Sequence, residues 1–247
     1  YDTTVPTMAI TSSTVDSGSS TNTAAIVLTF TSSETTTDFI AGDITVSGCN
    51  LGSLSGSGVT YTATCTATSD GTPSVSVTAD KFSDATGNTN SAASNTYTWT
   101  YDGTAPTMAI ASTTSGVSDG SKTNDGTIAL TFTSSEATTN FASEDVTVSG
   151  GTLTDFAGSG TDYTATFTPS GDGATTIDVG ASFTDAVGNA NTAATQFNWE
   201  YDGTAPTMTI STGTVSSGGT TNTAAIALTF TSSETTTDFI AGDITVS

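Results

Sequence analysis

Apolar and polar residues alternate along most of the chain. In the stretch "AIVLTFT", Ile26, Leu28 and Phe30 fall on one side of an extended segment and polar or small residues fall on the other. A period of two predicts β-strands with one buried face. We find no segment with helical periodicity, so we predict an all-β chain. Further alternating runs are Ile44/Val46, Tyr61/Ala63/Cys65, Val75/Val77 and Tyr97/Trp99/Tyr101.

The same text restarts about every hundred residues, as "YDTTVPTMAI" at Tyr1, "YDGTAPTMAI" at Tyr101 and "YDGTAPTMTI" at Tyr201. Self-similarity at a fixed period is typical of tandem domains. With "TMAI" at the front and a short "LGSLS" strand in the middle, each repeat has about seven short strands separated by Gly, Asp, Asn and Ser clusters. This predicts tandem immunoglobulin-like Greek-key β-sandwiches. We expect repeat 1 at residues 1–100, repeat 2 at 101–200, and the first half of repeat 3 at 201–247.

The third repeat contains strands A, B and the start of strand C, which cannot close a sandwich. Either the remaining strands follow in the same protein, or another chain completes the fold and the protein polymerises. Residues 20–47 and 220–247 differ only at Ser20/Thr220 and Val27/Ala227. This faithful copying favours the first alternative.

The charge balance excludes several functions. The chain carries a net charge of −22, with two Lys or Arg, 24 Asp or Glu and no His. Without histidine there is no imidazole for acid–base catalysis or for the usual zinc sites, and no nucleophile–base pair is visible, so we do not expect an enzyme. Two cations cannot neutralise nucleic-acid phosphates, and an anionic membrane surface would repel the chain. No run of residues is apolar enough to insert directly into a membrane.

The phrase "FTDAVGN" followed by "YDGTAPT" resembles the Ig-like repeats of large bacterial surface adhesins, and the resemblance covers the whole chain. It implies an extender module that is extracellular or lies at the cell surface. Several such adhesins bind calcium where two domains meet, so the resemblance also implies calcium at the domain junctions of this chain.

Acidic residues recur at the same places in each repeat. If the strands run alternately down and up, the B–C, D–E and F–G loops gather at the end where the domain begins. In repeat 2 these places hold Asp102 in the hinge, Glu136 in the B–C loop, and Asp185 with Asn189 in the F–G loop. The corresponding residues are Asp2, Glu34, Asp84 and Asn88 in repeat 1, and Asp202 and Glu234 in repeat 3.

Such carboxylates would repel one another without a cation, whereas calcium takes several oxygen ligands at once. We therefore predict structural calcium at the junctions, with Asp70 from the E–F loop of the preceding domain facing the cluster of repeat 2. In the other interpretation, "DAVGN" is only an Asx-turn in which Asp185 caps backbone amides and Gly188 supplies a positive φ, and the other acids are solvated.

The two cysteines occur only in repeat 1, where Cys49 and Cys65 stand in place of Gly151 and Phe167 of repeat 2. We expect Cys49 to end strand C and Cys65 to lie at the same end of strand E, so that a disulfide joins them. Closing that loop contributes about 3 kcal/mol in the chain-entropy model. Two free buried thiols are the alternative.

Together these patterns predict a structural extracellular array. It is a calcium-stiffened stalk of a surface adhesin or the repeating body of an extracellular fibre, and its partners are neighbouring repeats or, in a fibre, identical chains. The alternative is a module whose loops bind a glycan or a protein. Because the repeats are near-copies whose shared features lie at junctions, the spacer is favoured. Trp99 and Trp199 could stack on a sugar, but their alternation with aromatic residues indicates core positions.

Overall fold

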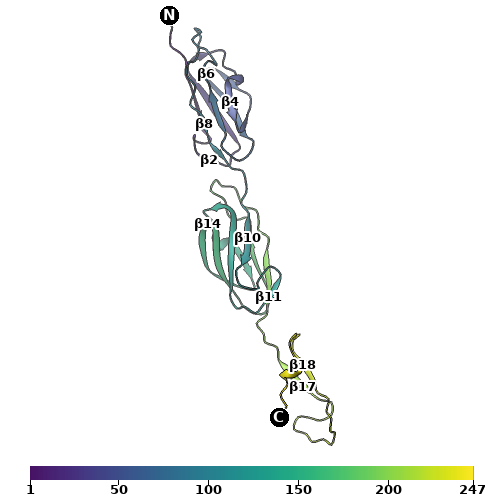
Figure 1. Ribbon diagram of the computed structural model, residues 1–247. Helices are drawn as coiled ribbons and strands as arrows, with labels where there is room; N and C mark the ends of the chain where they lie inside the picture. Colours follow the sequence, from purple (N-terminus) through teal and green to yellow (C-terminus); the bar gives the residue numbers. More distant parts are fainter. Residues whose placement is uncertain (247) are drawn as a thin grey trace.

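The computed structural model describes residues 1–246, in which two β-sandwiches and the third repeat follow one another from the N-terminus to the C-terminus (Figure 1). Over this range there is no α-helix. The only helical elements described are 3₁₀ turns at Ala41–Asp43 (η1), Ser143–Asp145 (η2) and Ala241–Asp243 (η3). The all-β prediction is therefore confirmed.

Domain 1 forms two facing sheets. One sheet has the order β1-β3-β6-β5, the other has β4-β7-β8, and β2 pairs in parallel with β9. This is the ABED and CFG division of a constant-type immunoglobulin sandwich. Its strands are Met8–Ser12 (β1), Ser20–Thr21 (β2), Ala25–Thr36 (β3), Ile44–Ser47 (β4), Cys49–Leu51 (β5), Ser55–Ala67 (β6), Ser74–Val77 (β7), Tyr97–Thr98 (β8) and Thr100–Tyr101 (β9).

Domain 2 repeats the arrangement, with sheets β10-β12-β14 and β11-β16-β15-β13. Within β14, Gly151 and Gly158 lie against the main chain of Thr168 and Asp162, so this segment contains both arms of a hairpin. The predicted tandem Ig-like sandwiches are confirmed. The strands are Met108–Ser112 (β10), Ser121–Thr123 (β11), Ile128–Thr138 (β12), Val146–Ser149 (β13), Gly151–Pro169 (β14), Gly173–Val179 (β15) and Phe197–Tyr201 (β16).

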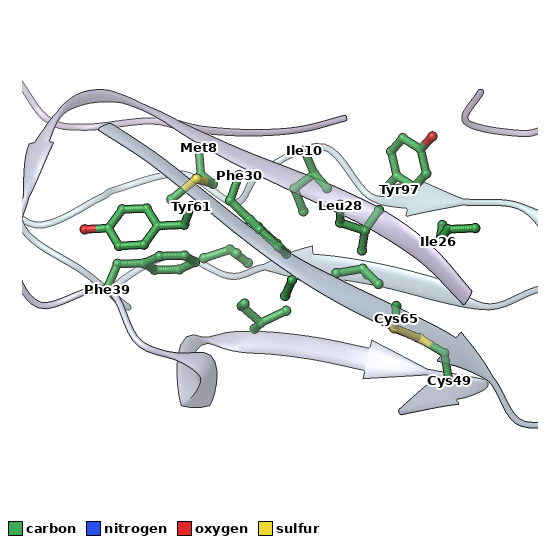
Figure 2. Packing of buried hydrophobic residues seen from close by; sticks show 14 of the residues in the cluster. Met8, Ile10, Ile26, Leu28, Phe30, Phe39, Cys49, Tyr61, Cys65 and Tyr97 are labelled. Carbon is green, nitrogen blue, oxygen red and sulfur yellow. A yellow bond between two sulfur atoms is a disulfide. The ribbon is translucent and has the colours of Figure 1, made fainter. Parts of the chain in front are cut away.

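Each sandwich has its own apolar core. Ile26, Leu28 and Phe30 of β3 are completely buried, as their alternation predicted, and Figure 2 shows them pointing into the space between the sheets. Trp99 and Trp199 are also buried, at 0% and 2% exposure. They are core residues, so neither ring is available to stack on a sugar.

The chain changes sheets at Gly48, and this corrects two sequence-based expectations. Strand β4 ends at Ser47, and Cys49 begins β5 in the opposite sheet, so the prediction that Cys49 ends strand C is wrong. The turn needs the positive φ of 70° at Gly48, a conformation that favours glycine. The expected "LGSLS" strand is also wrong, because β5 stops at Leu51 and β6 starts at Ser55.

A disulfide joins Cys49 to Cys65, and its Cα atoms lie 5.8 Å apart. Because β5 and β6 are neighbours, the bond links two strands of one sheet at the edge of the core (Figure 2). In domain 2 the buried ring of Phe167 takes this place, 4.9 Å from the Trp199 ring centroid in an edge-on arrangement. A Cβ at Gly151 would overlap that ring. The same region of the core is thus filled by a disulfide in domain 1 and by an aromatic ring in domain 2.

In the third repeat, Met208–Ser211 (β17) pairs with Thr229–Ser232 (β18). Its alternating residues do not form a core: Ile210 is 63% exposed, whereas Ile10 at the matching position in domain 1 is 2% exposed. Two strands present one apolar face, and within residues 201–246 no second sheet covers it.

Candidate metal centres

Two clusters of three carboxylates lie at the beginning of the two complete domains. One carboxylate oxygen each from Asp102, Glu136 and Asp185 lies within 4.8 Å of the others. The hinge, β12 and the F–G loop supply these residues, so the structure brings together acids that are far apart in sequence. Asp185 is only 5% exposed and the other two are half-buried. The equivalent cluster of domain 1 consists of Asp2, Glu34 and Asp84.

The two glutamates do not lie in the B–C loops, where the sequence placed them. Glu136 belongs to β12 and Glu34 to β3, near the ends of these strands. Each strand is irregular there, because the register with the neighbouring strand shifts between Thr133 and Thr138 in domain 2 and at the matching place in domain 1. Such a bulge bends a strand and re-aims its side chains. Both glutamates lie within these irregular stretches and belong to the clusters.

The F–G loop is folded around its aspartate. Asp185 Oδ1 accepts hydrogen bonds from the backbone amides of Val187, Gly188 and Asn189, at 2.9, 2.7 and 2.9 Å. Gly188 has a φ of 96°, which the turn requires. Asp84 caps its own loop in the same way. The Asx-turn that we considered as an alternative to an ion site is therefore present, and the same aspartate also belongs to the three-acid cluster.

The two asparagines act as donors in this arrangement. Asn189 Nδ2 donates to Asp185 Oδ2 at 2.8 Å and to the main-chain oxygen of Asp102 at 3.0 Å. Asn88 makes the matching bonds to Asp84 and to the Asp2 carbonyl. Each asparagine thus ties the F–G loop to the hinge. It presents its amide nitrogen to the cluster, so the three acids are the candidate metal ligands.

The acids within a cluster have opposite pKa shifts. Burial, followed by the charges of Asp102, Asp185 and Asp70, raises the pKa of Glu136. Burial would also raise the pKa of Asp185, but hydrogen bonds from the Asn189 side chain and from backbone amides outweigh it and hold the pKa below its usual range. Glu34 and Asp84 are shifted in the same two directions. Each cluster therefore combines a firmly ionised aspartate with a glutamate whose charge is resisted by its neighbours.

A model of the bacterial Ig-like domain family matches residues 2–101 and, again, residues 102–201. The chain belongs to this family. No curated protein matches the chain. Within residues 1–246, no helix is long and apolar enough to span a membrane.

Several solved structures are similar to this pair of bacterial Ig-like domains. For invasin, a bacterial integrin-binding protein, the TM-score is 0.42 at 15% identity, over 84% of this chain and 42% of that one. For InvD of Yersinia pseudotuberculosis, the TM-score is 0.36 at 18% identity, over 87% of this chain and 65% of that one. For the C-terminal domain of the Streptococcus agalactiae AgI/II polypeptide BspA, the TM-score is 0.38 at 9% identity, over 79% of this chain and 99% of that one. The chain therefore spans less than half of the invasin structure.

The third sequence repeat does not assemble a cluster in the part that the structure describes. Asp202 and Glu234 occupy the positions of Asp102 and Glu136, but residues 201–246 contain no counterpart of the F–G loop aspartate. These two residues remain predicted ligands only.

Sequence reasoning missed a pair of buried asparagines behind the clusters. Asn191 is 3% exposed and makes four hydrogen bonds to the main chain, accepting from Ser182 and Phe183 and donating to Gly180 and Thr192. Asn90 does the same in domain 1. The signal in the sequence was the second asparagine of "GNTN" in domain 1 and of "GNAN" in domain 2. These residues hold the F–G loop against the sandwich.

The opposite pKa shifts predict a stability maximum in mild acid when no metal is present. The raised pKa values of Glu34 and Glu136 mean that the folded chain takes up protons first as the pH falls towards about 4.3, the usual glutamate value, so stability should rise. The lowered pKa values of Asp84 and Asp185 mean that, below about pH 3.9, the unfolded chain takes up protons first and stability should fall.

Thermal melting in chelator between pH 7 and 2.5 checks this expectation. The E34Q/E136Q double variant is the control, because it should lose the rise in mild acid while keeping the loss at lower pH. A melting temperature that falls steadily from pH 7 would contradict the shifts assigned to the glutamates.

Proposed function

We propose that this chain is part of an extracellular spacer, the stalk of a bacterial surface adhesin, and that calcium bound by the three-acid clusters stiffens its domain junctions. The observation that carries the proposal is the repetition of one cluster, built from the hinge, strand B and the F–G loop, at the start of both complete domains. Catalytic and ligand-binding sites need not recur in every repeat of an array. A junction clamp must recur.

An ion at the second cluster would act on both domains. Asp102 is a candidate ligand of domain 2, while its backbone amide donates to the Thr21 carbonyl of domain 1 at 3.1 Å. The domains are close at this point, since a Cβ at Gly188 would lie 3.5 Å from Asn22 Nδ2. Binding Asp102, Glu136 and Asp185 to one cation would therefore fix the hinge to domain 2 where it is already bonded to domain 1.

The ligand chemistry favours calcium. The three carboxylates offer hard oxygen ligands, and calcium accepts several of them in irregular geometry together with water and carbonyl oxygens. Magnesium requires near-octahedral geometry and gives up its water reluctantly. Calcium would also relieve the repulsion that raises the pKa of Glu136.

The test is melting and small-angle X-ray scattering of the full chain in calcium, in magnesium and in chelator. A ligand that binds only the folded state stabilises it by about 2.7 kcal/mol at a hundred times its dissociation constant. We expect calcium to raise the melting temperature and narrow the range of interdomain angles, and magnesium to do much less. Equal melting curves and scattering profiles in calcium and chelator would refute the clamp. Lateral association of chains in calcium would indicate a fibre body instead of a stalk.

A further inference from the structure

The E–F loop of each complete domain reaches forward onto the hinge that follows it. Asp70 Oδ1 accepts a hydrogen bond from the Gly103 amide at 2.7 Å, and its Oδ2 is hydrogen-bonded to the Thr104 hydroxyl. The same contacts recur at the next junction, where Asp172 accepts from Gly203, also at 2.7 Å, and from Thr204. The loops themselves differ in sequence, "ATSDGTPS" against "PSGDGATT", and share little beyond the Asp-Gly pair.

Further contacts extend this grip along the hinge. Next to Asp70, Gly71 exchanges two backbone hydrogen bonds with Tyr101, at 2.9 and 2.8 Å. The first domain therefore holds the chain from Tyr101 to Thr104. The second domain holds it from the other side, because Thr192 donates to the Pro106 carbonyl at 3.0 Å. The two sets of contacts overlap at Asp102, whose carbonyl accepts from Asn189 of domain 2, and only Ala105 separates Thr104 from Pro106, so the hinge has almost no free linker.

The hinge glycine leaves room for the side chain of its neighbour. A Cβ at Gly103 would overlap the hydroxyl end of the Tyr101 ring, and a Cβ at Gly203 would overlap Tyr201 in the same way. The tyrosine ring therefore lies where a side chain two positions later would make it move. The matching position before domain 1 holds Thr3.

We propose that Asp70 and Asp172 are interdomain positioning residues, which lock the following hinge in the absence of any ion, and that Asp70 thereby places Asp102 for the second cluster. Carboxylates that accept an amide and a hydroxyl make charge-assisted bonds, which are stronger than neutral ones. A hinge that is already ordered loses less entropy when an ion binds it. The effect on ion binding rests on the proposed function, whereas the lock itself does not.

The lock is tested by amide hydrogen exchange, measured by NMR on the full chain in chelator. In D70A we expect the Gly103 amide to exchange about tenfold faster or more, because it loses its charged acceptor. The Gly203 amide, held by Asp172, is an internal control that should not change, and D172A should give the reverse pattern. D70N keeps one oxygen acceptor and should restore part of the protection. Unchanged exchange of Gly103 in D70A would overturn the lock.

A calcium titration of the same variants separates the two proposals. If the lock prepares the hinge, D70A should weaken calcium binding at the Asp102 cluster several-fold and leave the Asp2 cluster unchanged. Equal affinities of D70A and the wild-type chain at the Asp102 cluster would overturn this preparatory role. If the wild-type chain binds no calcium, the proposed clamp fails, and the exchange experiment still decides whether Asp70 locks the hinge.

Discussion

Substituting Asp185 with asparagine is expected to remove one of the two calcium ions that we propose for the chain. The D185N change removes one negative charge and leaves the second cluster with two acids, and calcium affinity depends strongly on the number of charged ligands. The bond that Asp185 Oδ2 accepts from Asn189 Nδ2 is lost, because the asparagine places a second donor there. The F–G turn should survive, because an asparagine oxygen can still accept the three amides that Asp185 Oδ1 now caps. We expect binding at this site to weaken by more than about tenfold.

Isothermal titration calorimetry on the full chain measures the number of calcium ions bound per chain. The wild-type chain should bind two ions, D185N one, and D84N one, because Asp84 occupies the matching position in domain 1. The double variant should bind none. In D185N the remaining affinity should equal that of the first cluster measured in the wild-type chain. Two ions bound by D185N would show that the ligands lie elsewhere.

Moving the domain 1 disulfide into domain 2 is expected to give strongly non-additive changes in stability. F167C removes a fully buried ring and should cost about 3 kcal/mol of unfolding free energy. G151C alone should also destabilise the fold, because its Cβ would overlap the Phe167 ring. In the oxidised double variant the overlap with the ring is gone and only the close approach to the Thr168 main-chain oxygen remains. A bridge like the one spanning 16 residues in domain 1 should restore about 3 kcal/mol.

Denaturant unfolding followed by Trp199 fluorescence in a W99F background reports on domain 2 alone. A coupling energy of several kcal/mol between positions 151 and 167 is expected under oxidising conditions, and in reductant, which serves as the control, it should fall to the part that comes from relieving the overlap with the Phe167 ring. If G151C and F167C add independently in the oxidised protein, the two positions are not equivalent to Cys49 and Cys65.

Much of the candidate site could be predicted from the sequence. Strand direction was enough to place Asp102 and Asp185 at one end of a domain, because the Greek-key order fixes which loops share an end. It also placed Glu136 at that end, but in the B–C loop instead of in β12. The roles of individual atoms could not be predicted. Whether Asn189 offers its oxygen or its nitrogen depends on where the Asp102 carbonyl lies, and that carbonyl is 87 residues away in the chain.

The period-two strands, the repeat length and the buried positions of Ile26, Leu28 and Phe30 can all be derived from the sequence, because alternation and self-similarity are local or periodic properties of the chain. Three features became clear only in three dimensions: the change of sheets at Gly48, the irregular end of β12 that carries Glu136, and the contact of Asp70 with the next hinge. These features depend on backbone groups from distant segments meeting at hydrogen-bonding distance. Such meetings follow from how the sheets pack, and no pattern of side chains along the chain records them.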